Sequence, residues 1–115
     1  MSGEQSTEIT PQRLAEWLAD PDPPQLIDVR EPHERDAGYI DGSRHVPLTT
    51  LSDAAAAVER ERPVVFYCRV GARSAMAMQA FRASGYEAYS LSGGLLRWAD
   101  EDRPLAPEGG TVANH

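Results

Sequence analysis

Short apolar runs alternate with longer polar or amphipathic segments along most of the chain. The runs at 25–29 (QLIDV) and 63–67 (PVVFY) are typical of buried strands, and PVVFY is the most strand-like stretch of the sequence. HVPL at 45–48 and YEAYSL at 86–91 also predict strands, although Pro47 limits the pairing of the first. The pattern therefore predicts several short strands that are well separated along the chain.

The segments between these runs predict helices. Thr10 and Pro11 form a good helix start, with Thr at the N-cap and Pro at the first helical position, and PDPP at 21–24 ends that helix. Ser52 is placed to cap a helix over DAAAAVER that stops before Pro63. The remaining helical segments are a short helix with a loop within 30–43, a helix over 73–84 followed by Gly85, and a short helix over 94–100.

Strands that alternate with helices predict one α/β domain. The connections are then right-handed crossovers, and the sheet is mainly parallel and covered on both faces. The chain of 115 residues fits a single domain over 7–105, with flexible ends at 1–6 and 106–115. Ligand sites in such sheets lie beyond the carboxyl ends of the strands, so residues directly after the predicted strands are the first candidates for chemistry.

Composition narrows the function classes. The net charge of −7 argues against nucleic-acid binding, and no stretch approaches the length of a membrane span. All eleven basic residues are arginine, which removes lysine Schiff-base chemistry. A single cysteine excludes an intrachain disulfide and a cysteine-rich zinc site, and the histidines lack ligand spacing, so no metal is expected. These features fit a reducing, cytoplasmic setting.

The only cysteine follows directly from the PVVFY run, at the start of the loop CRVGAR. Gly71 lets this loop curl so that its N–H groups point inward, and the free N–H groups of the following helix face the same centre. Arg69 and Arg73 add positive charge, so a thiol at Cys68 gains from ionising. The alternative is a buried, inert cysteine, but the apolar run stops at Cys68 and does not continue beyond it. The pattern favours a nucleophile with an anionic partner.

Several segments in order resemble the single-domain rhodanese-like sulfurtransferases. They are LIDVREPHERDAGYIDGS at 26–43, HVPL at 45–48, VVFYCRVGARS at 64–74 and LSGGLLRWADEDRPL at 91–105. The resemblance spans nearly the whole domain, and the combination of these segments is specific. Tyr39 and Ser43-Arg44 depart from the family pattern, and they lie outside the cysteine loop.

The resemblance implies a fold, an activity and a set of site residues. The fold is a three-layer rhodanese-like α/β domain, with a mainly parallel five-stranded sheet flanked by helices on both faces. Cys68 would carry a sulfane sulfur as a persulfide, from a donor such as thiosulfate to cyanide or a thiol. The chain would act as a monomer without cofactors. The residues implied are Cys68 as the nucleophile, the loop Arg69, Val70, Gly71, Ala72, Arg73 and Ser74 around the sulfur and the anion, and Asp28 and Arg30 in support.

The residues of this sequence also leave two other functions open. The same fold could serve as a relay module that docks a protein partner and accepts sulfur from a protein persulfide. Protein tyrosine phosphatases use C-x5-R, whereas four residues separate Cys68 from Arg73, which makes a tighter loop suited to sulfur. Asp28 is expected to act structurally at its strand end. The resemblance implies that Arg73, ahead of Arg69, binds the anionic end of the donor, and the alternative is that Arg73 pairs with a carboxylate such as Glu31.

Overall fold

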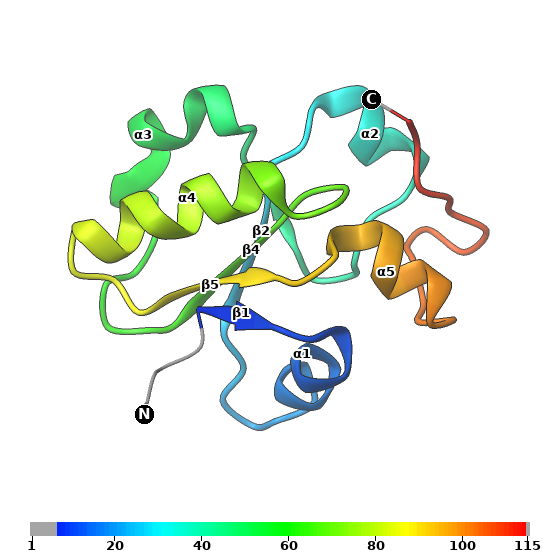
Figure 1. Cartoon of the computed structure of the whole chain (residues 1–115), viewed down its shortest axis with the longest axis horizontal. Coiled ribbons are helices and arrows are strands. Elements are labelled where there is room, and N and C mark those ends of the chain that lie inside the picture. The colour runs from blue at the N-terminus through cyan, green and yellow to red at the C-terminus, as the bar shows by residue number, and fades with distance from the viewer. Residues whose placement is uncertain (1–6, 115) are drawn as a thin grey trace.

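The computed structural model of the protein describes residues 7–114 (Figure 1). The flexible N-terminus expected at 1–6 lies outside the described residues, as does His115. Within the described part, one sheet holds five parallel strands in the spatial order β1–β5–β4–β2–β3. The strands are β1 (Glu8–Ile9), β2 (Gln25–Asp28), β3 (Arg44–His45), β4 (Val64–Tyr67) and β5 (Ala88–Leu91). The predicted α/β class is confirmed.

Helices cover both faces of the sheet (Figure 1). They are α1 (Pro11–Leu18), α2 (Pro32–Ala37), α3 (Leu51–Ala54), α4 (Ala72–Ala83) and α5 (Gly94–Asp100). One core forms where α3 and α4 pack on the sheet, and a second forms on the α1 and α5 face. Side-chain alternation in β4 serves both cores, because Val64 and Phe66 enter the first while Val65 and Tyr67 enter the second. No helix among residues 7–114 combines the length and apolarity needed to cross a membrane.

Helix boundaries at two places follow the local chemistry predicted from the sequence. The Thr10 side chain accepts a hydrogen bond from the Arg13 N–H at 3.2 Å, and Pro11 occupies the first helical position of α1. Gly85 follows α4 with φ +93°, a left-handed conformation that favours glycine. These caps fix where α1 begins and where α4 ends.

The helix predicted over DAAAAVER is wrong. The chain instead forms the single helical turn of α3, which already includes Ser52, and then a 3₁₀ turn at Ala55–Ala57. Val58 has extended backbone and is buried, and the Tyr86 hydroxyl donates to the Val58 carbonyl at 3.4 Å. The alanine run has high helix propensity but little apolar surface, so the burial of Val58 decides the conformation.

Two strands are shorter than the sequence predicts. β3 covers Arg44–His45 rather than 45–48, and β5 begins at Ala88 rather than at residue 86. The backbone beyond β3 still runs beside the end of β2, since the N–H groups of Val46 and Leu48 donate to the carbonyls of Asp28 and Val29 at 2.9 and 3.0 Å. Pro47 lies between these two donors, so its missing N–H faces the open edge of the sheet, where proline is tolerated.

The segment 106–114 lies against the domain, although the sequence predicts a flexible tail over 106–115. Ala106 pairs with Tyr39 in an antiparallel bridge, and the Thr111 N–H donates to the Ala37 carbonyl at 2.8 Å. A Cβ on Gly38 would lie 2.5 Å from the Thr111 oxygen, so only glycine fits at this backbone crossing. The segment thus covers the end of α2 and continues toward the cysteine loop.

Candidate active site

The cysteine loop lies at the carboxyl end of β4, between the ends of its neighbours β5 and β2. Cys68 directly follows β4, and α4 begins four residues later at Ala72. This is the edge of a parallel sheet where ligand sites form. The position predicted for the chemistry is therefore the position that the fold gives to Cys68.

Two backbone amides point at the sulfur. The Gly71 N–H donates to Cys68 Sγ at 3.1 Å, and the Ser74 N–H in the first turn of α4 donates to it at 3.4 Å. Gly71 has φ +115°, which lets the loop turn its amides inward. An arrangement of this kind stabilises negative charge on the sulfur.

The sulfur is nevertheless covered. Cys68 is 1% exposed and belongs to the core between the sheet and α4. The residue is thus buried, as the inert alternative requires, but its sulfur faces amides as well as aliphatic side chains. In the same loop Val70 is 45% exposed and marks the outer surface of the site.

The loop is held from behind by the start of α5. The N–H groups of Leu95 and Leu96 donate to the carbonyls of Cys68 and Arg69 at 2.8 and 3.0 Å. Gly94 has φ +63°, and a Cβ there would lie 2.4 Å from the Arg69 oxygen. These bonds hold the loop carbonyls away from the sulfur, so that the amides remain directed toward it.

Two buried serines extend from the sulfur into the sheet. Ser74 Oγ lies 3.6 Å from Cys68 Sγ, and Ser90 Oγ on β5 lies 2.7 Å from Ser74 Oγ. The Ser74 hydroxyl contacts the sulfur, Ser90 and the Gly71 carbonyl. Sequence reasoning missed Ser90. Its signal is a hydroxyl within an otherwise apolar buried strand.

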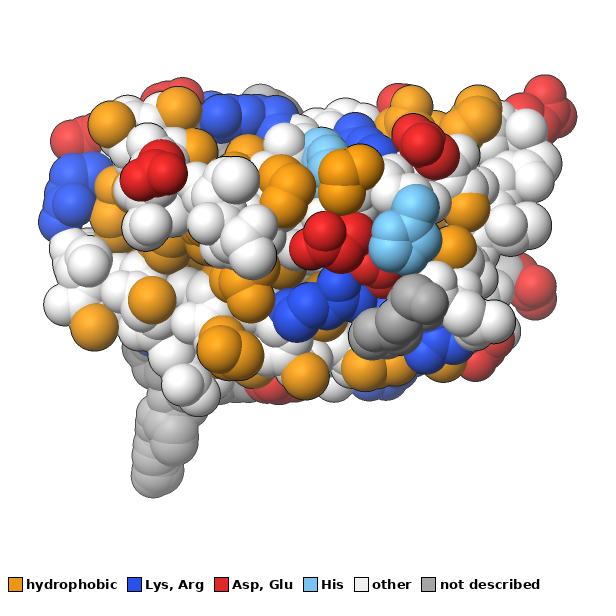
Figure 2. Space-filling view, turned by 90° about the horizontal axis from the view of Figure 1, so that it is seen from above, with side chains coloured by type: hydrophobic (Ala, Val, Ile, Leu, Met, Phe, Trp, Pro, Cys, Tyr) orange, Lys and Arg blue, Asp and Glu red, His pale blue; other side chains and the backbone are white. Residues whose placement is uncertain are grey.

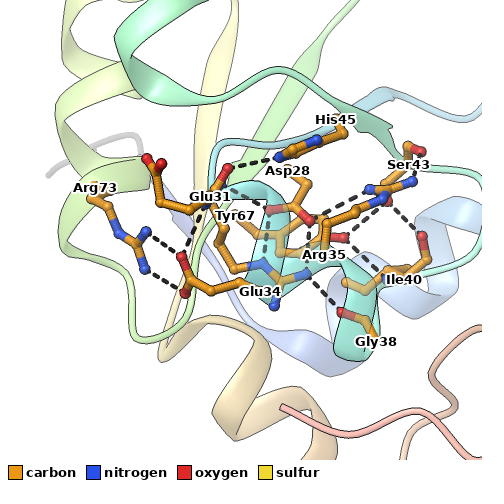
Figure 3. Close-up of polar contacts among 11 residues, drawn as sticks. Asp28, Glu31, Glu34, Arg35, Gly38, Ile40, Ser43, His45, Tyr67 and Arg73 are labelled. Atoms are coloured by element: carbon orange, nitrogen blue, oxygen red, sulfur yellow. Dashed lines mark hydrogen bonds and ion pairs between the residues drawn. The ribbon is translucent and has the colours of Figure 1, made fainter. Parts of the chain in front are cut away.

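Arg73 is paired with Glu34 rather than with Glu31 (Figure 3). Its two terminal nitrogens donate to the two carboxylate oxygens at 2.7 and 2.9 Å, and the Glu34 side chain is 1% exposed. Burial by itself acts to raise the pKa of Glu34, but hydrogen bonds from Arg73 and from the Glu31 N–H outweigh it and lower the pKa to about 2. Arg73 therefore faces a full carboxylate in the absence of substrate.

Glu34 was not among the residues singled out from the sequence. It is the third residue of α2, and it forms a capping box in which its side chain accepts from the Glu31 N–H at 3.0 Å. The Glu-x-x-Glu spacing after a strand is a signal for this cap. The spacing carries no information about Arg73, which is distant in the sequence.

Arg69 points toward the C-terminal segment. Its Nε donates to the Ala113 carbonyl and its Nη2 donates to Asn114 Oδ1, both at 3.2 Å. Both partners are uncharged. Figure 2 views the molecule from above, over α3 and α2, and acidic, basic and histidine side chains gather on the α2 side of this face.

Asp28 and Arg30 form a buried pair beside the loop. Arg30 donates through Nε and Nη2 to the two Asp28 oxygens at 2.8 and 2.7 Å, and both side chains are fully buried. Burial alone acts to lower the pKa of Arg30, but its bonds to Asp28 outweigh burial and raise it. The Glu34 charge contributes to the same rise. Figure 3 shows Glu34 between Asp28 and Arg73.

Further polar groups complete the network around Asp28 (Figure 3). Arg35 contacts Asp28 at 3.4 Å and donates to Ser43 Oγ at 2.8 Å. The Tyr67 hydroxyl accepts from the Ile40 N–H at 3.0 Å and shares a 2.9 Å bond with Ser43. Burial, and then the nearby Asp28 charge, raise the pKa of Tyr67 to about 12, so this hydroxyl stays protonated. The network joins the end of β2 to α2 and the end of β4.

Within residues 7–114, no group of three or more histidine, cysteine, aspartate or glutamate side chains is arranged to hold a metal ion. The groups around the sulfur are backbone amides, two hydroxyls and an arginine held by a carboxylate. This set suits a sulfur nucleophile that carries negative charge.

The fold and the site together define a class of α/β domains. In this class, a loop at the end of a parallel strand directs backbone amides toward a nucleophilic cysteine. The family model described as the rhodanese-like domain matches residues 10–101, and the chain belongs to that family. The predicted family and fold are confirmed.

Relatives and a solved structure agree with this family. The chain is 37% identical over 99 residues to the probable adenylyltransferase/sulfurtransferase MoeZ of Mycobacterium tuberculosis, covering 84% of this chain but 25% of MoeZ. It is 36% identical over 104 residues to a sulfurtransferase of Allochromatium vinosum, covering 89% of this chain and 97% of the relative. A rhodanese-related protein of Thermoplasma volcanium superposes with a TM-score of 0.81 at 29% identity, covering 88% and 98% of the two chains.

Proposed function

We propose that the protein is a sulfurtransferase that moves a sulfane sulfur from a donor such as thiosulfate to cyanide or a thiol through a persulfide on Cys68. The observation that carries the proposal is the pair of amides, from Gly71 and Ser74, that donate to Cys68 Sγ. Two donors aimed at one sulfur favour its ionised form, which is the nucleophilic form of cysteine.

The reaction balances without an external oxidant. The Cys68 thiolate attacks the outer sulfur of thiosulfate, an Sγ–S bond forms, and sulfite leaves with the electron pair of the broken sulfur–sulfur bond. Cyanide or an acceptor thiolate then attacks the outer sulfur of the persulfide and regenerates the Cys68 thiolate. Cys68 is the only cysteine, so the attacking thiol in the second step comes from another molecule.

The two loop arginines receive different roles. Arg69 is bonded to a carbonyl and an amide oxygen, which a sulfonate anion displaces readily because the anion forms the stronger hydrogen bonds. Arg73 is held by the buried Glu34 carboxylate, so its first role is to fix the end of the loop and to add positive charge near the sulfur. We therefore propose that Arg69 binds the anionic end of the sulfur donor, while Arg73 adds positive charge nearby.

Asp28 and Arg30 act on the cysteine loop indirectly. Their buried pair secures the backbone after β2, and Glu34 connects that backbone to Arg73. We assign both residues a supporting role.

All the groups named in the proposed reaction come from one chain, so the proposed chemistry needs no second copy. A free nucleophilic thiol is best maintained in a reducing compartment such as the cytoplasm.

A protein persulfide as the physiological donor is the second candidate. The similarity to MoeZ, in which the matched region is 25% of a longer protein, favours it, and Val70 at the outer surface of the loop is exposed to a partner. A phosphatase is less favoured, because four residues separate Cys68 from Arg73 and the loop contains no carboxylate to act as a general acid.

Intact-protein mass spectrometry tests the persulfide. We expect thiosulfate treatment to add one sulfur atom to the wild-type protein and cyanide to remove it, while Cys68→Ser gains none. Arg60→Ala is the matched control, because Arg60 contacts the Ser84 carbonyl and the Tyr86 ring and not the loop. The absence of the adduct from folded wild-type protein would refute thiosulfate as donor, and sulfur loading only by a protein persulfide would support the relay function.

A further inference from the structure

A pair of buried hydroxyls lies directly behind the reactive sulfur. Ser74 and Ser90 are both fully buried, and their oxygens are 2.7 Å apart. Ser74 comes from the first turn of α4 and Ser90 from β5, so the contact joins two elements across the α4 face of the sheet. Ser90 is too deep in the sheet to touch a substrate, and the proposed reaction assigns it no part.

Hydrogen-bond accounting fixes the direction of this pair. Ser74 Oγ is the partner of the Ser90 hydroxyl within the described part of the chain. A buried hydroxyl that fails to donate loses the energy of a hydrogen bond, so the Ser90 proton goes to Ser74 Oγ. The proton of Ser74 is then free for another acceptor, and the two within reach are the Gly71 carbonyl at 3.2 Å and Cys68 Sγ at 3.6 Å.

The charge on the sulfur decides between these two acceptors. A neutral Cys68 thiol donates its own S–H to Ser74 Oγ, and Ser74 then donates to the Gly71 carbonyl. An ionised sulfur accepts only, so the Ser74 proton turns toward it as a third donor beside the two backbone amides. Donation from Ser90 strengthens Ser74 as a donor, because linked hydrogen bonds polarise one another.

We propose that Ser90 is a positioning residue for Cys68, acting through the Ser74 hydroxyl to favour the ionised sulfur. The proposal rests on the proposed function only in taking Cys68 as the nucleophile. Without Ser90, the Ser74 hydroxyl receives no hydrogen bond from behind, so it is less polarised and is a weaker donor to the ionised sulfur. Removal of the Ser90 hydroxyl therefore shifts Cys68 toward the neutral thiol.

Alkylation of Cys68 by iodoacetamide as a function of pH tests this proposal, and it needs no sulfur donor or acceptor. We expect Ser90→Ala to raise the midpoint of the rate profile by roughly half a pH unit and to leave the high-pH plateau unchanged. Ser74→Ala removes the direct donor and is expected to raise the midpoint by about one to two pH units. Ser84→Ala, an exposed serine at the end of the same helix, is the control with no shift.

A double-mutant comparison separates action through Ser74 from a general loss of packing. Because Ser90 acts through Ser74, Ser74→Ala combined with Ser90→Ala should give the same midpoint as Ser74→Ala alone. Ser90→Thr and Ser90→Val form a pair of nearly equal shape, and only Thr should retain the wild-type midpoint. Additive midpoints in the double variant, equal midpoints for Thr and Val, or a wild-type midpoint in folded Ser90→Ala would each overturn the proposal.

The outcome is distinguishable from failure of the proposed function. A missing persulfide adduct together with the expected alkylation shifts would reject thiosulfate chemistry and keep the role of Ser90. A normal adduct together with an unshifted Ser90→Ala profile would keep sulfur transfer and reject the role of Ser90. Raman spectroscopy of the Cys68 S–H stretching band across the same pH range provides a second readout, in which Ser90→Ala should retain the band to higher pH.

Discussion

Glu34→Gln is the most direct test of how the cysteine loop is anchored. Glu34 is buried, and it binds Arg73 through both carboxylate oxygens while also accepting from the Glu31 N–H. Glutamine has nearly the same shape as glutamate, but it carries no charge. Its amide NH₂ group replaces one of the two carboxylate oxygens that accept from Arg73, and this group cannot accept. The substitution therefore changes one interaction between α2 and α4 and leaves the core volume almost unchanged.

The magnitude follows from the pKa of Glu34, which lies at about 2 in place of the ordinary 4.5. Each pKa unit corresponds to about 1.4 kcal/mol, so the ionised carboxylate stabilises the fold by about 3 kcal/mol at neutral pH. The Arg73 side chain is 22% exposed and regains some water when its partner is neutral. We therefore expect Glu34→Gln to lower the free energy of unfolding by about 2–3 kcal/mol at pH 7.

The sign of the pH dependence is fixed by the lowered pKa. The contribution of Glu34 is fully present above about pH 4.5 and is lost as the pH falls toward 2. Glutamine does not titrate, so the difference between wild type and Glu34→Gln should shrink across this interval. Urea unfolding followed by tryptophan fluorescence at pH 7, 4 and 3 measures it.

Glu101→Gln is the matched control for this series. Glu101 pairs with Arg97 and Arg103 at the surface, and exposed pairs of this kind contribute little. A loss below 1 kcal/mol for Glu34→Gln at pH 7, or a loss that stays constant down to pH 3, would show that Glu34 does not anchor Arg73 in the way the geometry indicates.

Three further outcomes are expected. Arg69→Ala should raise the KM for thiosulfate by roughly 10–100-fold, because a hydrogen bond to a charged group is lost, whereas Arg60→Ala should leave KM near wild type; equal values in steady-state assays would remove the special role of Arg69. Gly94→Ala should destabilise the protein by more than about 2 kcal/mol in urea unfolding, because the added Cβ meets the loop backbone. Gly109 has φ +86° but open space around it, so the control Gly109→Ala should lose only about 1 kcal/mol. Asp28→Asn breaks a fully buried ion pair and should lower the free energy of unfolding by about 3–5 kcal/mol, and a stable variant with a large loss of transfer rate would instead make Asp28 part of the chemistry.

Local patterns were sufficient to predict the scaffold of the site. PVVFY predicts β4 because it is a short, β-branched and aromatic run, and Gly85 predicts the end of α4 because a left-handed residue is needed there. Cys68 could be placed at a strand end because the apolar run stops at that residue. Each of these inferences uses residues within a few positions of one another.

The supports of the loop could not be predicted in this way. Glu34 is 39 residues from Arg73, and the Ala113 carbonyl is 44 residues from Arg69, so no spacing in the sequence signals either contact. The α3 region fails for the same reason, since the burial of Val58 beside Tyr86 overrides the helix propensity of the alanine run. Which carboxylate meets Arg73 depends on the sheet order that brings α2 beside α4.

The cysteine loop gains its shape from backbone groups at the start of α5 that lie behind it. If the peptides between Cys68 and Val70 turned over, the carbonyls of Cys68 and Arg69 would lose their bonds to the start of α5 and would face the sulfur instead. The left-handed conformation of Gly94 is what allows α5 to approach closely enough to prevent this. Because the carbonyls are bonded before a donor arrives, the amides need no reorganisation when charge develops on the sulfur, which is the condition under which fixed dipoles stabilise charge most. Gly94, the first residue of α5, therefore supports the candidate active site through the loop backbone and not through a contact with the sulfur.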